Sequence, residues 1–121
     1  MPITRPYWLR PLIVVYAKAQ YNMRLTTQQQ HAIISTFLEV FGKGEIRLFG
    51  SRVDDTQRGG DIDLYVIPES REQLAEARIT FLARLKRRIG EQKIDLVIAA
   101  TPPRPIDHIA QKTGVVLCQN R

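Results

Sequence analysis

The sequence predicts a single domain of the α+β class. The first observation is its length of 121 residues, which suits one domain that buries about two-thirds of the surface its unfolded chain exposes. The second is the order of helix-like and strand-like segments, which is helix, strand, strand, helix, strand, helix, strand. The third is the composition, because 44% hydrophobic and 25% charged residues are ordinary for a soluble globular protein.

Two long helices are predicted from apolar residues at helical spacing. The first begins after a cap at Thr26 or Thr27 and stops at residues 42–44, where two glycines flank a lysine. Its apolar stripe consists of Ile33, Ile34, Phe37, Leu38 and Phe41. The second begins at a capping box over Ser70–Gln73 and ends near Gly90. Its expected buried residues are Leu74, Ala77, Phe81, Leu82 and Leu85.

Four strands and a short third helix complete the prediction. The strands are Glu45–Phe49, the run from Asp61 that Pro68 breaks, Gln92–Ala100, and Val115–Cys118. The proline-rich link over residues 102–105 predicts extended backbone before a helix from about Ile106 to Lys112. Gly114 is expected to close this helix as its C-terminal cap.

Three aspartates are expected on one face of the sheet. Because side chains alternate along a strand, Asp61 and Asp63 share a face that Ile62 does not. Asp95 likewise points away from the apolar side of its strand, so all three carboxylates meet if the strands are neighbours. Two ionised carboxylates about 4 Å apart repel by roughly 4 kcal/mol at an effective dielectric constant of about 20. The group therefore favours a site for Mg²⁺, which binds carboxylate oxygens.

A glycine-serine turn follows the first predicted strand. Gly50 has no side chain and Ser51 has a small one, so backbone amides at this turn can approach phosphate groups closely. Taken alone, the turn and the acids would each suggest an ordinary solvated surface. Together they indicate a site for a nucleoside triphosphate and a divalent metal ion.

These motifs resemble those of a known family. Phe49-Gly50-Ser51-Arg52, Gly60-Asp61-Ile62-Asp63-Leu64 and the later strand aspartate are similar to the minimal nucleotidyltransferases of the DNA polymerase beta superfamily. The resemblance covers roughly Met23 to Leu117 and implies a polymerase-beta-like fold, with a mixed sheet packed against two or three helices. Members this small resemble the MNT antitoxins encoded beside HEPT-domain toxins, which transfer AMP from ATP to a tyrosine of the toxin.

The resemblance implies a role for each residue of the site. Gly50 would let the triphosphate approach, Ser51 would hold its phosphates, and Arg52 would neutralise phosphate charge or brace the loop. The same carboxylates would bind the metal ions, expected to be two Mg²⁺, and would act in catalysis. These carboxylates are Asp61, Asp63 and Asp95. A hydroxyl group of the acceptor would then attack the α-phosphorus of ATP, and pyrophosphate would leave.

More than one function stays open. The expected function is an enzyme, a protein adenylyltransferase whose partner is a HEPT-type toxin encoded nearby. The alternatives are an antitoxin that neutralises by contact alone, and nucleotidyl transfer to a small molecule or RNA, which the short chain disfavours. The net charge of +6 and the basic residues between Arg78 and Lys93 suit an anionic ligand. A solvated helix face is the commoner explanation, so direct nucleic-acid binding is not expected.

The first residues depart from the pattern of the rest. Residues 1–22 hold three of the seven prolines and are interpreted as an N-terminal extension before a domain of residues 23–121. They are either an upstream extension or an accessory element that packs on the domain or a partner. The single cysteine, Cys118, excludes an internal disulfide and fits a reducing cytosol. The apolar run Leu12–Ala17 is too short for a bilayer span, so a cytoplasmic location is expected.

Overall fold

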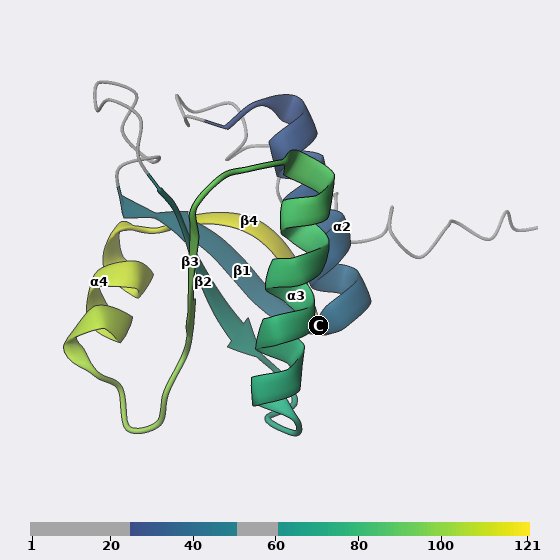
Figure 1. Ribbon diagram of the computed structural model, residues 1–121. Helices are drawn as coiled ribbons and strands as arrows, with labels where there is room; N and C mark the ends of the chain where they lie inside the picture. The colour runs from purple at the N-terminus through teal and green to yellow at the C-terminus, as the bar shows by residue number, and fades with distance from the viewer. Residues whose placement is uncertain (1–24, 51–60) are drawn as a thin grey trace, which may run out of the picture.

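In a computed structural model of the chain, the structure describes residues 25–50 and 61–121. Within these ranges the elements follow the predicted order (Figure 1). The helices are α2 (Thr27–Val40), α3 (Leu74–Ile89) and α4 (Pro105–Thr113). The strands are β1 (Gly44–Phe49), β2 (Ile62–Pro68), β3 (Ile94–Ile98) and β4 (Val115–Asn120). The α+β class predicted from the sequence is confirmed.

The strands form one mixed sheet in the order β3-β2-β1-β4. β1 is antiparallel to both of its neighbours, β2 and β4, whereas β2 and β3 are parallel. Parallel strands need a crossover connection, and α3 provides it. In the described sheet, β2 is therefore a central strand and β3 is an edge strand.

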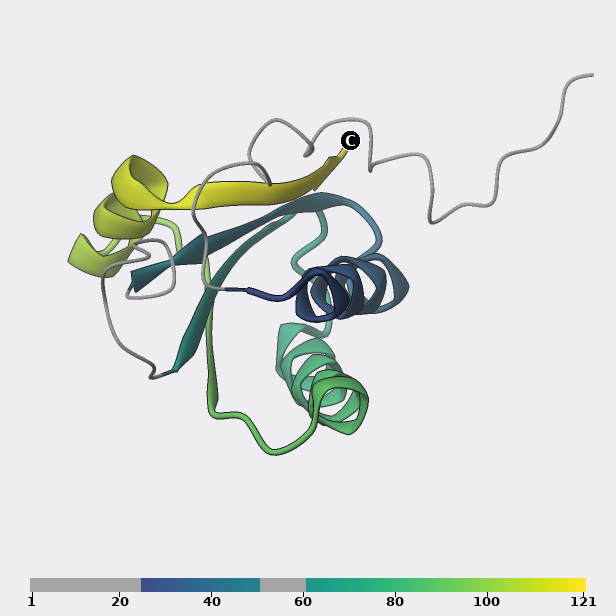
Figure 2. The same cartoon turned by 90° about the horizontal axis from the view of Figure 1, so that it is seen from above.

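Helices cover both faces of the sheet, but unequally (Figure 2). α2 and α3 pack on one face, where fully buried side chains such as Phe37 and Phe81 meet Leu64 of β2. α4 packs on the other face over a smaller cluster. This cluster is formed by Phe49, Tyr65, Ala99 and Ala110. The alternation predicted for β2 is thus confirmed, with Ile62, Leu64 and Val66 in the larger core.

The helix ends show where local sequence patterns succeed and fail. Thr26 caps α2 as predicted, since its side chain accepts a hydrogen bond from the Gln29 amide at 3.0 Å. The capping box predicted for Ser70–Gln73 is wrong. α3 begins only at Leu74, and Gln73 before it is left-handed, with φ of 55° and no side-chain cap. The Ser70 hydroxyl instead accepts from the Glu72 amide at 3.3 Å, so it is used within the turn.

Gly114 ends α4, but for a reason that the sequence did not indicate. Its backbone is extended, with φ of −73° and ψ of 150°, and is not the left-handed form usual for a glycine cap. A Cβ atom here would lie 2.4 Å from the Ala110 carbonyl oxygen and 3.3 Å from Cβ of Arg47. Glycine is therefore required chiefly because a Cβ atom would clash with the last turn of α4, and the contact with β1 leaves little further room.

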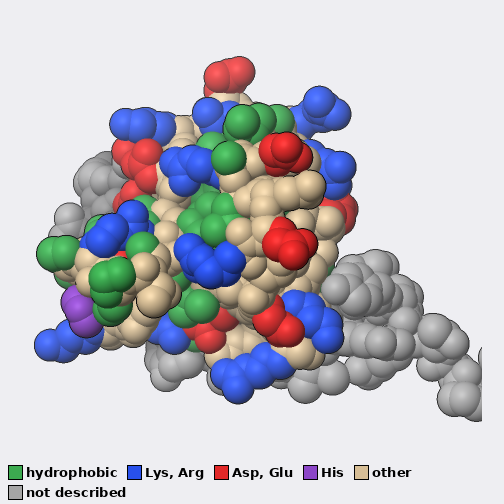
Figure 3. All heavy atoms as spheres, turned by 90° about the horizontal axis from the view of Figure 1, so that it is seen from below, with side chains coloured by type: hydrophobic (Ala, Val, Ile, Leu, Met, Phe, Trp, Pro, Cys, Tyr) green, Lys and Arg blue, Asp and Glu red, His purple; other side chains and the backbone are tan. Residues whose placement is uncertain are grey.

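Charged side chains of both signs occupy the surface. On the face shown in Figure 3, acidic and basic side chains are interspersed around a small apolar area. On α3, Arg84 and Arg88 contact Glu39 of α2 at 3.3 and 2.8 Å, so part of the basic cluster is neutralised by the neighbouring helix. No helix in the described ranges is long and apolar enough to cross a membrane.

Candidate active site

Asp63 and Asp95 meet where β2 and β3 run side by side. The two aspartates are paired in the parallel register of these strands, so both side chains leave the same face of the sheet. The two carboxyl groups lie close enough to share a hydrogen bond when one of them is protonated. Because a hydrogen bond between two carboxyl groups needs a proton on one of them, this contact favours holding a proton or a cation at this point.

The surroundings of Asp63 raise its pKa to about 6, from an ordinary value of 3.8. Burial is the largest cause, because it disfavours the charged form of the carboxyl group. The negative charge of Asp95, its hydrogen bond and the charge of Asp61 raise the pKa further, and only Lys93 lowers it. A perturbed carboxyl group among like charges is typical of a functional site.

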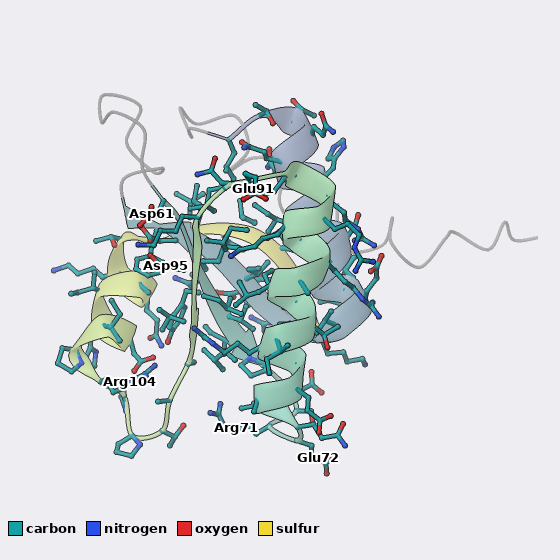
Figure 4. All side chains as sticks on the ribbon, viewed as in Figure 1. Asp61, Arg71, Glu72, Glu91, Asp95 and Arg104 are labelled. Carbon is teal, nitrogen blue, oxygen red and sulfur yellow. The ribbon has the colours of Figure 1, made fainter. Side chains whose placement is uncertain are left out.

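Asp61 lies just before β2, and its carboxylate contacts the side chain of Lys93. Its Oδ2 atom is 3.4 Å from Nζ of Lys93, a side chain that is 70% exposed. The backbone amide of Ile62 donates to the Lys93 carbonyl oxygen at 3.0 Å, so the two strands are already paired beside this contact. Figure 4 shows Asp61 and Asp95 toward the same end of the sheet. All three acids therefore gather at this end, with Lys93 beside them.

Gly50 at the end of β1 is in contact with the acidic group. Its φ of 77° is a left-handed backbone conformation that residues with a side chain rarely adopt. A Cβ atom at this position would lie 2.3 Å from Oδ2 of Asp63. The missing side chain thus makes room for the carboxylate group of Asp63. Ser51 and Arg52, the other residues predicted to bind the nucleotide, lie outside the described residues.

The donor set fits a divalent metal ion in its chemistry. Hard oxygen ligands suit Mg²⁺, and burial together with the charges of Asp95 and Asp61 raises the pKa of Asp63 although Lys93 lowers it. The finished three-ligand geometry is not preformed. Among residues 25–50 and 61–121, no three acidic, histidine or cysteine side chains stand ready to hold one ion. Asp63 and Asp95 are in contact, while Asp61 is turned toward Lys93.

A buried polar network on the same face was not predicted from the sequence. Asp107 of α4 is fully buried, and its Oδ1 atom accepts from the Tyr65 hydroxyl at 2.8 Å. Its Oδ2 atom accepts from Nε of Arg104 at 2.9 Å. The Arg104 guanidinium, first among several donors, holds the pKa of Asp107 well below its usual range. The signal that could have revealed this network is Tyr65, because a buried tyrosine hydroxyl needs a partner.

Comparison with known proteins supports the resemblance seen in the motifs. A family model described as polymerase beta, nucleotidyltransferase, matches residues 33–121. The match spans nearly three quarters of the chain and includes Gly50 and all three aspartates. A search of curated proteins gave no match.

Proposed function

The chain belongs to the polymerase beta nucleotidyltransferase family, and on this premise we propose that it transfers AMP from ATP to a tyrosine of a HEPT-type toxin, acting as its antitoxin. Nucleotidyl transfer is the activity of the family. The acceptor, the nucleotide and the antitoxin role are our proposal. The observation that supports it most directly is the side-by-side position of Asp63 and Asp95 next to Gly50.

The carboxylates of the site have separate roles in this proposal. Asp61, Asp63 and Asp95 would hold Mg²⁺, which supplies positive charge to the phosphates when bound. Asp95 is exposed on an edge strand, so an acceptor hydroxyl can reach it and give up its proton there. The hydroxyl oxygen bonds to the α-phosphorus as the bond from this phosphorus to the β-phosphate oxygen breaks. Pyrophosphate leaves, and AMP remains on the acceptor.

The exposure of Asp95 supports an acceptor carried on another protein. A cavity of about 260 Å³ lies between α2 and α3, and another of about 360 Å³ lies beside Gly44 and Arg121. Neither cavity is lined by any of the three aspartates. Asp95 is exposed, which suits a tyrosine presented on a partner's surface.

The test is the intact mass of the partner. The full chain would be incubated with the HEPT-type protein encoded nearby, ATP and Mg²⁺, and both masses would be measured. We expect the partner to gain one or more AMP groups, and to gain none with the Asp63→Asn variant. Replacing the modified tyrosine of the partner by phenylalanine should abolish the adduct. Addition of AMP elsewhere, or of another nucleotide in preference, would contradict the proposed specificity.

An antitoxin that acts by contact alone is the second candidate. It is favoured by the finding that no three-ligand metal group stands preformed among the described residues. A stable complex with unchanged masses, and neutralisation that survives Asp63→Asn, would select this candidate. Three neighbouring acids argue against it, because a protein that only binds gains nothing from their mutual repulsion.

A further inference from the structure

We propose that Tyr65, Asp107 and Arg104 form a brace that sets the position of Asp95 relative to Asp63. The three residues are positioning residues, since none of them belongs to the acidic group itself. The inference rests on the proposed function, because it assigns Asp63 and Asp95 to metal binding. It concerns how the fold holds these two carboxylates together.

The need for such a brace follows from the place of β3 in the sheet. β3 has five residues, lies at the edge, and pairs only with β2 among the described strands. Asp95 is its second residue, so the register of one short strand pair decides whether Asp95 faces Asp63. An edge strand without support on its outer side opens more easily than a central strand.

Arginine side chains take the place of a neighbouring strand along this edge. The Ala99 amide donates to the Val66 carbonyl at 2.8 Å, which shows that odd-numbered residues of this segment pair with β2. The carbonyl groups of Leu96 and Ile98 therefore point outward. Arg78 of α3 donates to the Leu96 carbonyl, and Nη2 of Arg104 donates to the Ile98 carbonyl at 2.8 Å. Both carbonyl groups are thus held from outside the sheet.

Arg104 differs from Arg78 because it is also tied to β2. Its Nε atom donates to Asp107, and Asp107 accepts from the hydroxyl of Tyr65, which is a β2 residue. The chain of bonds therefore runs from Tyr65 through Asp107 and Arg104 to Ile98. It joins the same two strands that carry the acids, two residues beyond Asp63 and three beyond Asp95.

The components of the brace are themselves well fixed. Asp107 is fully buried, and it also accepts from the backbone amides of Arg104 at 2.6 Å and Ala100 at 3.3 Å. Gln111 donates to the Tyr65 hydroxyl at 3.1 Å. Burial and multiple bonds hold the Asp107 carboxylate in one orientation, so a shift of β3 against β2 would break bonds at both ends of the chain.

Arg71 supplies a matched control. Its Nη2 atom donates to the Ala99 carbonyl at 2.8 Å, one residue from the carbonyl that Arg104 holds. Figure 4 shows Arg104 beside α4 and Arg71 beside the start of α3. Arg71 makes the same kind of bond to the same segment, but this bond is not linked through Asp107 to Tyr65 on β2. Loss of either arginine removes an arginine-to-carbonyl bond, whereas only loss of Arg104 breaks the brace.

The experiment measures Mn²⁺ binding to the full chain without nucleotide, by electron paramagnetic resonance. We expect Arg104→Met and Tyr65→Phe each to raise the Kd for Mn²⁺ by about tenfold, the usual lower bound for loss of a group that orients a metal ligand. Arg71→Met should change the Kd for Mn²⁺ less than twofold. It should lower Tm by about as much as Arg104→Met does. The Arg104→Met/Tyr65→Phe double variant should bind no more weakly than Arg104→Met, because both changes break one chain of bonds.

The outcomes separate the brace from the proposed function. Equal Mn²⁺ affinity in the wild type, Arg104→Met and Tyr65→Phe would overturn the brace, as would an equal loss in Arg71→Met. If Arg104→Met fails to fold, Tyr65→Phe decides the matter, because it keeps the ring contact with Phe49. Wild-type protein that binds Mn²⁺ but transfers no nucleotide would overturn the proposed function and leave the brace standing. Wild-type protein that binds no Mn²⁺ would overturn both.

Discussion

Asp63 and Asp107 lie on the same side of the sheet in opposite electrostatic surroundings. Asp63 is near Asp95 and Asp61, and its pKa is raised to about 6, chiefly by burial and then by those neighbours. Asp107 is more deeply buried, yet the Arg104 guanidinium and several N–H and O–H donors keep its pKa below the usual range. Burial alone therefore does not distinguish a structural carboxylate from a functional one. What distinguishes the two carboxylates is the number of hydrogen-bond donors around them. Asp107 has several, and Asp63 has fewer.

The largest expected effect comes from neutralising the poorly matched acid. Asp63→Asn should reduce nucleotide transfer by about a thousandfold or more, because a carboxylate ligand is lost where charge must be neutralised. It should not lower the stability of the metal-free protein, since it removes repulsion with Asp95. Transfer of labelled AMP and thermal unfolding with EDTA measure the two effects. Undiminished transfer would contradict the role of Asp63.

Neutralising the well-matched acid should have the opposite outcome. Asp107→Asn should lower Tm by on the order of 10 °C, because it removes the charged partner of Arg104 from a fully buried position. Calorimetry of this variant beside Glu72→Gln, a change at an exposed acid, checks the prediction. A Tm close to that of the wild type would mean that the network around Asp107 contributes little to folding.

A side chain at Gly50 should disturb the acidic group directly. Gly50→Ala places a methyl group where the Asp63 carboxylate now lies, and at a φ of 77° it also strains the backbone. We expect transfer to fall by roughly tenfold to a hundredfold and stability to fall by about 1 to 2 kcal/mol. Gly90→Ala is the control, because it has a similar φ of 86° but open space around the added atom. Equal loss of transfer in both variants would refute a specific role for the space beside Asp63.

The two acids should also give different pH dependences of folding. The pKa of Asp63 is higher in the folded protein than the ordinary 3.8, so without metal its contribution to stability falls as pH rises from about 4 to 6. The loss should be about 1 to 2 kcal/mol after allowance for solvent screening at a partly exposed group. The pKa of Asp107 is lowered in the folded protein, so its contribution to stability changes in the opposite direction, growing as pH rises through the ordinary value of 3.8. Urea unfolding with EDTA, compared between wild type and Asp63→Asn, should show the slope only in the wild type.

The smallest effect is expected at Lys93. Its contact with Asp61 is 3.4 Å long and its side chain is 70% exposed, so Lys93→Met should cost no more than about 0.5 kcal/mol in metal-free protein. The loss should shrink at high salt, because exposed charges are screened. Unfolding free energies at low and high salt measure it. A salt-independent loss would show that the lysine stem contributes through packing.

Much of this arrangement could be predicted because it depends on local rules. Alternation along a strand predicted that Asp63 and Leu64 point to opposite faces of the sheet. The same rule predicted that Asp95 points away from the face that carries Leu96. The cap at Thr26 also needs only the next three residues. The Ser70–Gln73 capping box failed because the helix starts three residues later than the box requires, and the Ser70 hydroxyl bonds within the turn that precedes it.

The buried network could not be predicted because its members are distant in sequence. Asp107 follows a proline near the start of a short helix, where an acid is usually solvated and favoured by the helix dipole. Its burial depends on α4 packing over the face that carries Tyr65, and no local pattern states which face a helix covers. The contact of Gly114 with Arg47 on β1 has the same origin, whereas its closer approach to the Ala110 carbonyl is local to α4.

The parallel register of β2 and β3 limits which insertions and deletions this sequence can accept during evolution. Residues 64–94 separate the paired aspartates in sequence. A shift of one residue in the register of the two strands would turn Asp95 into the hydrophobic core and expose Leu96. Slippage by two would restore the side but displace the carboxylate by about 6 to 7 Å. Insertions or deletions after α3 should therefore preserve the site only when the loop of residues 90–93 changes length without shifting the register of β3.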